Sequence, residues 1–301
     1  MSSPYYIGVD LGGTGVKCAA INTGSGRVLR QADKPTSDGV VVDGEPAFVH
    51  AIRQLIGETE SECGRASGIG LSAPGLVALD ESCIEYMAGR LDGLMGLQWG
   101  EALRRDHAVP VLNDAQAALL GEVHMGAAKG LSNVFMLTLG TGVGGASMVD
   151  GHLLRGHIGR AGHLGHITID YNGEGDIVKT PGSLEDAIGN ATIKTRSLGH
   201  FETTHALIEA YRRGDRKAES IWLDSLKALA AGIASLINVL DPEAVIIGGG
   251  IAVAGDALFD PLGEILDQFE WRPMDRQVRL LPAELGPWAG CYGMACKVAG
   301  L

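Results

Sequence analysis

Residues 7–21 read IGVDLGGTGVKCAAI, and residues 135–149 read FMLTLGTGVGGASMV. In both stretches an apolar segment runs into a turn of glycine and threonine, and a second apolar segment follows it. Each copy then reaches another glycine-containing turn, at 23–26 and at 150–151. Apolar runs separated by such turns predict strands that form a meander. The repeat therefore predicts two related lobes, each of which offers a glycine-rich turn to a ligand.

The composition of the chain narrows its class. Its 301 residues allow one large or two medium domains, and its 46% apolar content allows substantial cores. A net charge of −12 argues against a broad surface for nucleic acids or anionic membranes. The sequence shows no signal-peptide pattern and no apolar run near the roughly 20 residues of a membrane span. We therefore expect a cytoplasmic protein without nucleic-acid or membrane partners.

Helical and strand patterns alternate along the rest of the chain, which predicts an α/β fold. The predicted helices are 46–60, 98–107, 115–127, 184–190, 202–213, 218–240, 256–270 and 288–299. Besides the two meanders, strands are predicted at 69–75, 109–112, 244–247 and 278–281. We expect a small N-terminal α/β lobe of residues 1–112, joined by the C-terminal helix 288–301. A large C-terminal α/β lobe would comprise residues 113–287.

The two glycine turns have the composition of phosphate-binding loops. Glycines let backbone N–H groups approach an anion without an intervening Cβ. The residues that would cradle phosphates are Gly12, Gly13 and Thr14 in the first turn, and Gly140, Thr141 and Gly142 in the second. Residues 140–145 also match G-x-G-x-x-G, but a dinucleotide fold needs a helix directly afterwards. Because strand-like residues follow here, we reject a dinucleotide site.

Asp10 ends an otherwise apolar strand directly before the first turn, and Lys17 follows that turn. A carboxylate at this position suits hydrated Mg²⁺ carried by a nucleotide, because Mg²⁺ takes few carboxylates and keeps several waters. The alternative is a capping or turn aspartate without a ligand.

Asn113 and Asp114 stand where a predicted strand ends and a helix begins. Open α/β sheets bind their ligands at that edge. Either residue could be a helix cap. A kinase also needs a carboxylate that accepts the proton of the attacking hydroxyl, and Asp114 is suited to that role.

His163 and His166 form an H-x-x-H pattern. A metal site is one interpretation, but no carboxylate or cysteine accompanies the pair. Neutral imidazoles that orient sugar hydroxyls are the favoured interpretation.

Six motifs in a consistent order carry a resemblance to one family. They are DLGGT at 10–14, PG at 74–75, ND at 113–114, LGTGVGG at 139–145, GSLE at 182–185 and IIGGGI at 246–251. Together they resemble the ROK family of sugar kinases and sugar-responsive regulators, within the actin-like/hexokinase ATPase superfamily. The resemblance implies a two-lobed actin-like ATPase (ribonuclease H-like) fold. Each lobe would be a mixed sheet flanked by helices, with the active site in the cleft between the lobes. It also implies a homodimer.

The resemblance implies a role for each matching residue. Asp114 would be the catalytic base, and Asp10 would face Mg²⁺. The sugar would be held by Gly75, Asn113, Asp114, His163, His166 and Glu185. The nucleotide ATP would be held by Asp10, Gly12, Gly13, Thr14, Lys17, Gly140, Thr141, Gly142, Gly249 and Gly250, the last two against the adenosine.

Two departures from the family pattern bear on function. The family's G-E-x-G-H reads GHLGH at 162–166, so His163 replaces a sugar-binding glutamate. The family's zinc segment, C-x-C-G-x-x-G-C, contains no cysteine here, and Ser183 replaces its last one. The five cysteines of the chain are scattered and form no C-x-x-C pair. We therefore predict that the protein has no structural zinc.

These observations predict an ATP-dependent sugar kinase. It would transfer the γ-phosphoryl group to a hexose hydroxyl, with O6 of glucose or a related hexose as the expected acceptor. One alternative is a kinase for an N-acetylhexosamine such as N-acetylmannosamine or N-acetylglucosamine. Another is a non-catalytic, sugar-sensing ROK protein. A DNA-binding regulator is disfavoured, because the first phosphate strand already begins at residue 5 and the chain is acidic.

Overall fold

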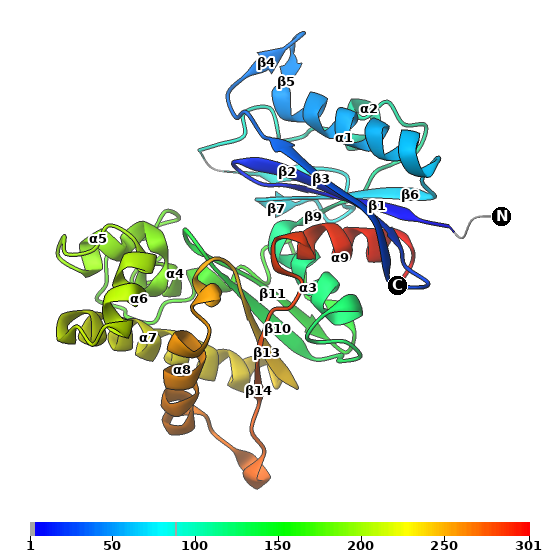
Figure 1. The fold of residues 1–301 in the computed structure, drawn as a ribbon. Helices are drawn as coiled ribbons and strands as arrows, with labels where there is room; N and C mark the ends of the chain where they lie inside the picture. Colours follow the sequence, from blue (N-terminus) through cyan, green and yellow to red (C-terminus); the bar gives the residue numbers. More distant parts are fainter. Residues whose placement is uncertain (1–3, 88) are drawn as a thin grey trace. The chain divides into compact units, whose positions relative to one another are not determined.

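A computed structural model describes residues 4–87 and 89–301, which form two compact units (Figure 1). The first unit comprises residues 1–130, 155–161 and 284–301. The second comprises residues 131–154 and 162–283. Each unit is built on its own five-stranded sheet.

The sheet of the first unit has the strand order β3-β2-β1-β6-β9. Its strands are β1 (Tyr6–Leu11), β2 (Gly15–Asn22), β3 (Arg27–Pro35), β6 (Gly68–Ala73) and β9 (Val111–Asn113). The strands β1, β2 and β3 form the predicted antiparallel meander, whereas β1, β6 and β9 run parallel to one another. The carboxyl ends of three strands therefore meet at one edge of this sheet.

Helices cover both faces of the first sheet (Figure 1). One face carries α1 (Ala47–Cys63), and the other carries α9 (Ala289–Val298) with α3 (Asp114–Met125) packed beside it. The predicted helix at 98–107 is shorter, because α2 (Trp99–Ala102) stops before Arg104, whose φ of 54° is left-handed. Short hairpins complete the unit: β4 (Val41–Val42) with β5 (Glu45–Pro46), and β7 (Leu76–Val77) with β8 (Ile84–Tyr86).

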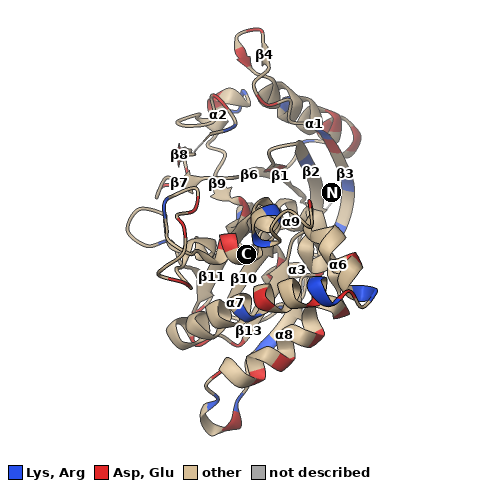
Figure 2. Cartoon of the chain, turned by 90° about the vertical axis from the view of Figure 1, so that its left-hand side faces the viewer, with Lys and Arg blue, Asp and Glu red and all other residues tan. Residues whose placement is uncertain are grey.

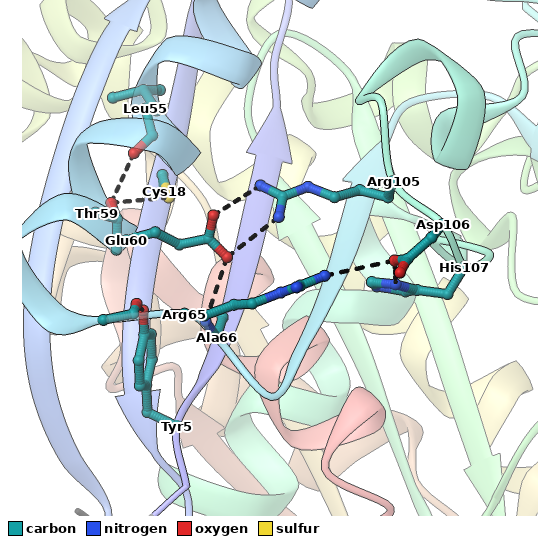
Figure 3. Close-up of polar contacts among 11 residues, drawn as sticks. Tyr5, Cys18, Leu55, Thr59, Glu60, Arg65, Ala66, Arg105, Asp106 and His107 are labelled. Atoms are coloured by element: carbon teal, nitrogen blue, oxygen red, sulfur yellow. Dashed lines mark hydrogen bonds and ion pairs between the residues drawn. The ribbon is translucent and has the colours of Figure 1, made fainter.

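Polar contacts fasten the end of α1 to the neighbouring loops of the first unit (Figure 3). Arg105 donates two hydrogen bonds to the Glu60 carboxylate, at 3.2 and 3.0 Å. Glu60 also accepts a bond from the backbone N–H of Ala66, and the Tyr5 hydroxyl donates to the carbonyl of Gly64. Bidentate arginine–carboxylate pairs have a specific geometry. They therefore fix where α1 ends relative to the loop after α2.

The sheet of the second unit repeats the topology of the first. Its strands are β10 (Val134–Leu139), β11 (Val143–Val149), β12 (His152–Leu153), β13 (Ala244–Gly248) and β14 (Arg279–Pro282). Their order is β12-β11-β10-β13-β14, again a meander followed by two parallel strands. The sequence repeat thus corresponds to a repeated sheet, and the predicted actin-like α/β fold is confirmed.

The longest helix, α7 (Arg216–Leu240), lies in the core of the second unit. The other helices of this unit are α4 (Leu184–Ile188), α5 (Ile193–Arg196), α6 (Thr204–Arg212) and α8 (Asp256–Phe269). Short 3₁₀ turns are η1 (Leu164–His166), η2 (Asn190–Thr192), η3 (Ile251–Ala254) and η4 (Pro273–Asp275), and η5 (Gly286–Trp288) lies in the first unit. By length and composition alone α7 could span a membrane, but half of its most apolar stretch is buried. Its apolar character is therefore that of a core helix.

Acidic side chains recur along α8 and basic ones do not (Figure 2). Its charged residues are Asp256, Asp260, Glu264 and Asp267. A helix with this pattern repels phosphate backbones and adds to the net charge of −12.

Helix α3 belongs to the compact first unit, because it packs against α9. The sequence places the boundary between the lobes at residue 112, before α3. As a division into functional lobes, 1–112 with 288–301 against 113–287 stays a prediction.

Candidate functional site

In the first unit, candidate site residues cluster at the carboxyl edge of the sheet. Asp10 lies near the end of β1, and Gly75 follows β6. Asn113 ends β9, and Asp114 begins α3. The register pairs Asp10 with Ser72 and Ala73 with Asn113, so the three strand ends are neighbours. Parallel sheets bind ligands at this edge.

Asp10 is held by polar side chains of the two neighbouring strands. The Ser72 hydroxyl donates to its Oδ1 at 2.7 Å, and Lys17 Nζ lies 3.9 Å from its Oδ2. Gly290 at the start of α9 leaves room for it, because a Cβ there would lie 3.1 Å from Oδ1. Burial raises the pKa of Asp10 to about 6; the Ser72 bond and the Lys17 charge oppose this rise, and the Asp114 charge adds to it.

Asp10→Asn should stabilise the nucleotide-free protein at neutral pH but not at pH 4. A carboxyl whose pKa is raised in the folded state costs nothing below its unfolded pKa. The cost grows as the pH rises toward the folded pKa and stays constant above it. With a pKa of about 6, the gain above pH 6 is roughly 1 to 3 kcal/mol. Thermal unfolding from pH 4 to 7.5 without Mg²⁺ measures it.

Asp33→Asn on the exposed side of β3 controls for the loss of one negative charge. If Asp10→Asn and the parent protein differ by the same amount at every pH, the pKa of Asp10 is not raised.

Hydrogen bonds close the first glycine turn and hold its carbonyl oxygens in place. The Gly12 N–H donates to the Gly15 carbonyl at 2.9 Å. The Thr36 hydroxyl donates to the Gly12 carbonyl at 2.6 Å, and its N–H donates to the Thr14 carbonyl at 3.1 Å. With these carbonyl oxygens bound to protein, the turn suits an anion on its N–H side.

Arg90 lies beside the first turn and was missed by sequence reasoning. A Cβ on Gly13 would lie 3.0 Å from its Nη1. No motif marks Arg90, because it comes from the segment after β8, far from the turn in sequence.

Asn113 and Asp114 combine a cap with an exposed carboxylate. Asn113 Oδ1 accepts the Ala115 N–H at 2.9 Å, which caps α3, and its Nδ2 donates to the Gly75 carbonyl at 3.2 Å. The capping role predicted for Asn113 is therefore present, and it fixes Asn113 against Gly75. Asp114 is exposed, and its Oδ1 accepts from the same Ala115 N–H. Its other carboxylate oxygen can accept a proton.

In the second unit, two glycine turns share the carboxyl edge of the sheet. The turn at 140–142 follows β10, and Gly249 and Gly250 follow the neighbouring strand β13. Gly249 has a φ of 88°, and a Cβ there would lie 2.3 Å from the Leu139 carbonyl oxygen. Only glycine fits this approach between the two turns. Both predicted nucleotide elements of this unit are therefore adjacent.

The second turn is held in place by the segment after α4. The Asn190 N–H donates to the Gly140 carbonyl at 2.9 Å, and the Ala191 N–H donates to the Thr141 carbonyl at 2.8 Å. As in the first turn, two carbonyl oxygens of the turn accept hydrogen bonds from neighbouring protein groups.

Glu185, which was predicted to bind sugar, contacts the second turn. Its Oε2 accepts the Val143 N–H at 3.0 Å. A Cβ on Gly142 would lie only 2.0 Å from the same oxygen. The carboxylate thus supports the second glycine turn, and sugar binding by Glu185 stays a proposal.

His163 directly precedes η1 and His166 ends it, and both side chains are partly buried. His166 Nδ1 lies 2.8 Å from Asp176 Oδ2. No sequence motif marks this contact with Asp176. Its only signal is the place of Asp176 within the altered zinc segment.

The predicted sugar residues fall into two groups by unit. Gly75, Asn113 and Asp114 belong to the first unit, whereas His163, His166 and Glu185 belong to the second. Among residues 4–87 and 89–301, no three His, Cys, Asp or Glu side chains are arranged to hold a metal ion.

Two sheets of one topology, each with a glycine turn after its first strand, define an actin-like ATPase fold. The chain belongs to the ROK family, whose model matches residues 6–300.

Individual relatives agree with this family. A glucokinase of Halalkalibacterium halodurans is 32% identical, with 97% of this chain and 94% of the relative covered. A bifunctional enzyme NanE/NanK of Brucella melitensis is 33% identical, with 98% of this chain and 54% of the relative covered. A ROK glucokinase from Streptomyces griseus, solved with glucose and AMPPNP, has a TM-score of 0.79 at 26% identity, with 97% and 98% covered. The protein is an ATP-dependent sugar kinase.

Proposed function

We propose that the enzyme phosphorylates a hexose hydroxyl, O6 of glucose or a related hexose, with Asp114 as the general base. The observation that carries this proposal is the placement of Asp114. It is exposed at the start of α3, directly after Asn113, whose amide is fixed to the Gly75 carbonyl. A base must be held firmly and still reach a substrate hydroxyl, and this arrangement provides both.

The proposed reaction is an in-line phosphoryl transfer. The sugar hydroxyl gives its proton to Asp114 while its oxygen forms a bond to the γ-phosphorus. The bond between that phosphorus and the β,γ-bridging oxygen breaks, and ADP leaves with the electron pair. Backbone N–H groups of the two glycine turns stabilise charge on the phosphates, except those of Gly12 and Gly140, which donate within their own turns. Gly249 and Gly250 take the adenosine in this proposal.

Asp10 is suited to an ion that accompanies the nucleotide. It offers a single carboxylate, beside a serine hydroxyl and at the edge of the sheet, and Mg²⁺ takes few carboxylates in nucleotide sites. Bound Mg²⁺ would neutralise charge on the phosphates. Asp10 would hold it, and Lys17, whose Nζ lies 3.9 Å from the carboxylate, would be a second cation near the phosphates.

A coupled ADP-release assay over hexoses, ketoses and N-acetylhexosamines tests the proposal. We expect sugar-dependent ADP release with glucose or a close analogue. If no sugar of the panel causes ADP release, but calorimetry still shows sugar binding, the protein would instead be a sugar sensor. The same assay with Mg²⁺ replaced by a chelator should show no turnover.

A second candidate substrate class is the N-acetylhexosamines, and His163 is the observation that favours it. The family glutamate at this position only accepts hydrogen bonds, whereas a neutral imidazole accepts one and donates one. An acetamido carbonyl is an acceptor that glucose lacks. The similarity to a bifunctional NanE/NanK enzyme is consistent with this class.

His163→Glu should shift preference toward glucose. Restoring an acceptor-only group should raise the ratio of kcat/KM for glucose to that for N-acetylmannosamine by about tenfold, which is the value of one matched hydrogen bond. His205→Glu on the exposed face of α6 is the matched control and should leave the ratio unchanged. An unchanged ratio in His163→Glu would show that position 163 does not select the sugar.

We further propose a homodimeric, cytoplasmic enzyme without nucleic-acid or membrane partners. The net charge of −12 and the acidic face of α8 support the absence of nucleic-acid binding. Light scattering in solution measures the oligomeric state.

A further inference from the structure

We propose that Asp176 organises segment 166–185 in place of a metal ion and positions His166 for the sugar. This inference rests on the proposed function only where it concerns sugar binding. Its structural part concerns residues of the second unit alone.

Asp176 is the centre of a hydrogen-bonded network. Its side chain is fully buried, and its Oδ2 lies 2.8 Å from His166 Nδ1. Its Oδ1 accepts the N–H groups of Val178 at 2.9 Å and Thr180 at 2.8 Å. The Ser183 side chain also lowers the pKa of this carboxylate. A buried carboxylate is tolerated only when its oxygens are satisfied in this way.

The charge of this carboxylate is stabilised by the same contacts. Burial alone would raise the pKa of Asp176. The bonds from His166, from the Thr180 and Val178 amides and from Ser183 outweigh burial, and the pKa lies below its ordinary value.

The network occupies the positions of the family's zinc ligands. Aligning C-x-C-G-x-x-G-C so that its last cysteine falls on Ser183 places the first on Asp176 and the second on Val178. His166 ends the neighbouring G-x-x-G-H motif. Asp176 therefore contacts His166 and the Val178 N–H through hydrogen bonds rather than through a metal.

The residues present do not fit zinc. A structural zinc site needs four nitrogen or sulfur ligands, with oxygen as a less common substitute. Val178 has no donor atom, and both oxygens of Asp176 are already used by protein donors. The segment is instead closed by bonds such as Asp176 N–H to the Thr180 carbonyl at 3.0 Å.

Asp176 also determines which nitrogen of His166 carries the proton. A carboxylate only accepts, so the Nδ1 that faces it is the donor. In the neutral ring Nε2 is then an acceptor, and it can receive a sugar hydroxyl.

Ser183 caps the helix that reaches the second glycine turn. Its oxygen accepts the Asp186 N–H at 3.3 Å as the cap of α4, and its side chain lowers the pKa of Asp176. The same helix carries Glu185, which accepts the Val143 N–H beside the second glycine turn.

The first test reads the tautomer of His166 without turnover. Protein labelled with ¹⁵N-histidine should show a protonated Nδ1 and an unprotonated Nε2 for the ring that is lost in His166→Asn. A protonated Nε2 with an unprotonated Nδ1 would overturn the proposal. Because this measurement needs no activity, it separates this inference from the proposed function.

The second test measures the Michaelis constant for sugar and that for ATP separately. In Asp176→Asn, the amide cannot satisfy His166 and both backbone N–H groups, because one of its two polar atoms is a donor. We expect the KM for sugar to rise about tenfold, with the KM for ATP changed less than twofold. Asp170→Asn, at an exposed position of the same segment, is the matched control. A native KM for sugar in Asp176→Asn would contradict the positioning role.

The third test measures zinc directly. The purified parent protein should hold no stoichiometric zinc by atomic emission. The triple variant Asp176→Cys, Val178→Cys, Ser183→Cys recreates the thiolate set beside His166 and should bind about one zinc per chain. Stoichiometric zinc in the parent protein, or a folded triple variant that binds none, would overturn the replacement of metal by Asp176.

Discussion

Asp114→Asn should lower kcat by about a thousandfold while the affinity for ATP stays near that of the parent protein. The amide cannot take the proton of the sugar hydroxyl, so the attacking oxygen remains a poor nucleophile. The fold should survive, because Asn at the start of α3 retains an oxygen that can accept the Ala115 N–H, as Asp114 Oδ1 does at 2.9 Å. Coupled ADP release gives kcat, and calorimetry gives the dissociation constant of ATP.

Two outcomes of this experiment are decisive. Near-native sugar-dependent ADP release in Asp114→Asn would show that another group accepts the proton. A joint loss of turnover and of ATP affinity would show a disturbed fold instead. Asp106→Asn, at an exposed aspartate of the same unit, should leave both constants unchanged and controls for charge.

The sheets of this protein were predictable because their signals are local. Apolar runs of strand length and the glycine turns between them lie within stretches such as 7–21 and 135–149. Each stretch folds into an antiparallel pair, β1 with β2 and β10 with β11. The polar residues at strand ends, Asp10 and Asn113, were found for the same reason. Strand ends of a parallel sheet converge on one edge, so position in sequence predicts position in space.

Contacts that depend on a chain folding back on itself could not be predicted in this way. Glu185 was assigned to the sugar by resemblance, but its Oε2 accepts a hydrogen bond from the Val143 N–H. Asp176 attracted no role at all, because an isolated aspartate in an irregular segment carries no periodic signal. Its importance comes from its bond to His166, ten positions earlier in the chain.

Gly8 shows the same limit in the core of the first unit. In the sequence it is one glycine within an apolar run. In the structure it faces α9, and a Cβ there would lie 1.7 Å from the Cys291 carbonyl oxygen and 3.0 Å from the Ala295 nitrogen. The register pairs Gly8 with Gly70 on β6, where a Cβ would lie 3.1 Å from the Met294 carbonyl oxygen. Paired glycines on adjacent strands thus let the helix backbone approach the sheet.

Gly8→Ala should therefore destabilise the protein by more than about 3 kcal/mol. The clash is with backbone atoms of α9, so relief requires the whole helix to move away from β1. Alanine otherwise stabilises a strand relative to glycine, so a loss of stability can be attributed to the clash with α9. Denaturant unfolding measures the change in free energy, and the melting temperature should fall by at least about 6 °C.

Gly57→Ala is the control that separates crowding from the substitution itself. Gly57 is exposed on α1, and a Cβ there meets nothing within 4 Å. Alanine should stabilise that helix by about 0.5 to 1 kcal/mol, because glycine loses more backbone entropy on folding. The same added methyl group should lower stability at Gly8, where it is crowded, and raise it at Gly57, where it meets no neighbour. A Gly8→Ala protein as stable as the parent would mean that α9 does not pack against β1 as closely as described.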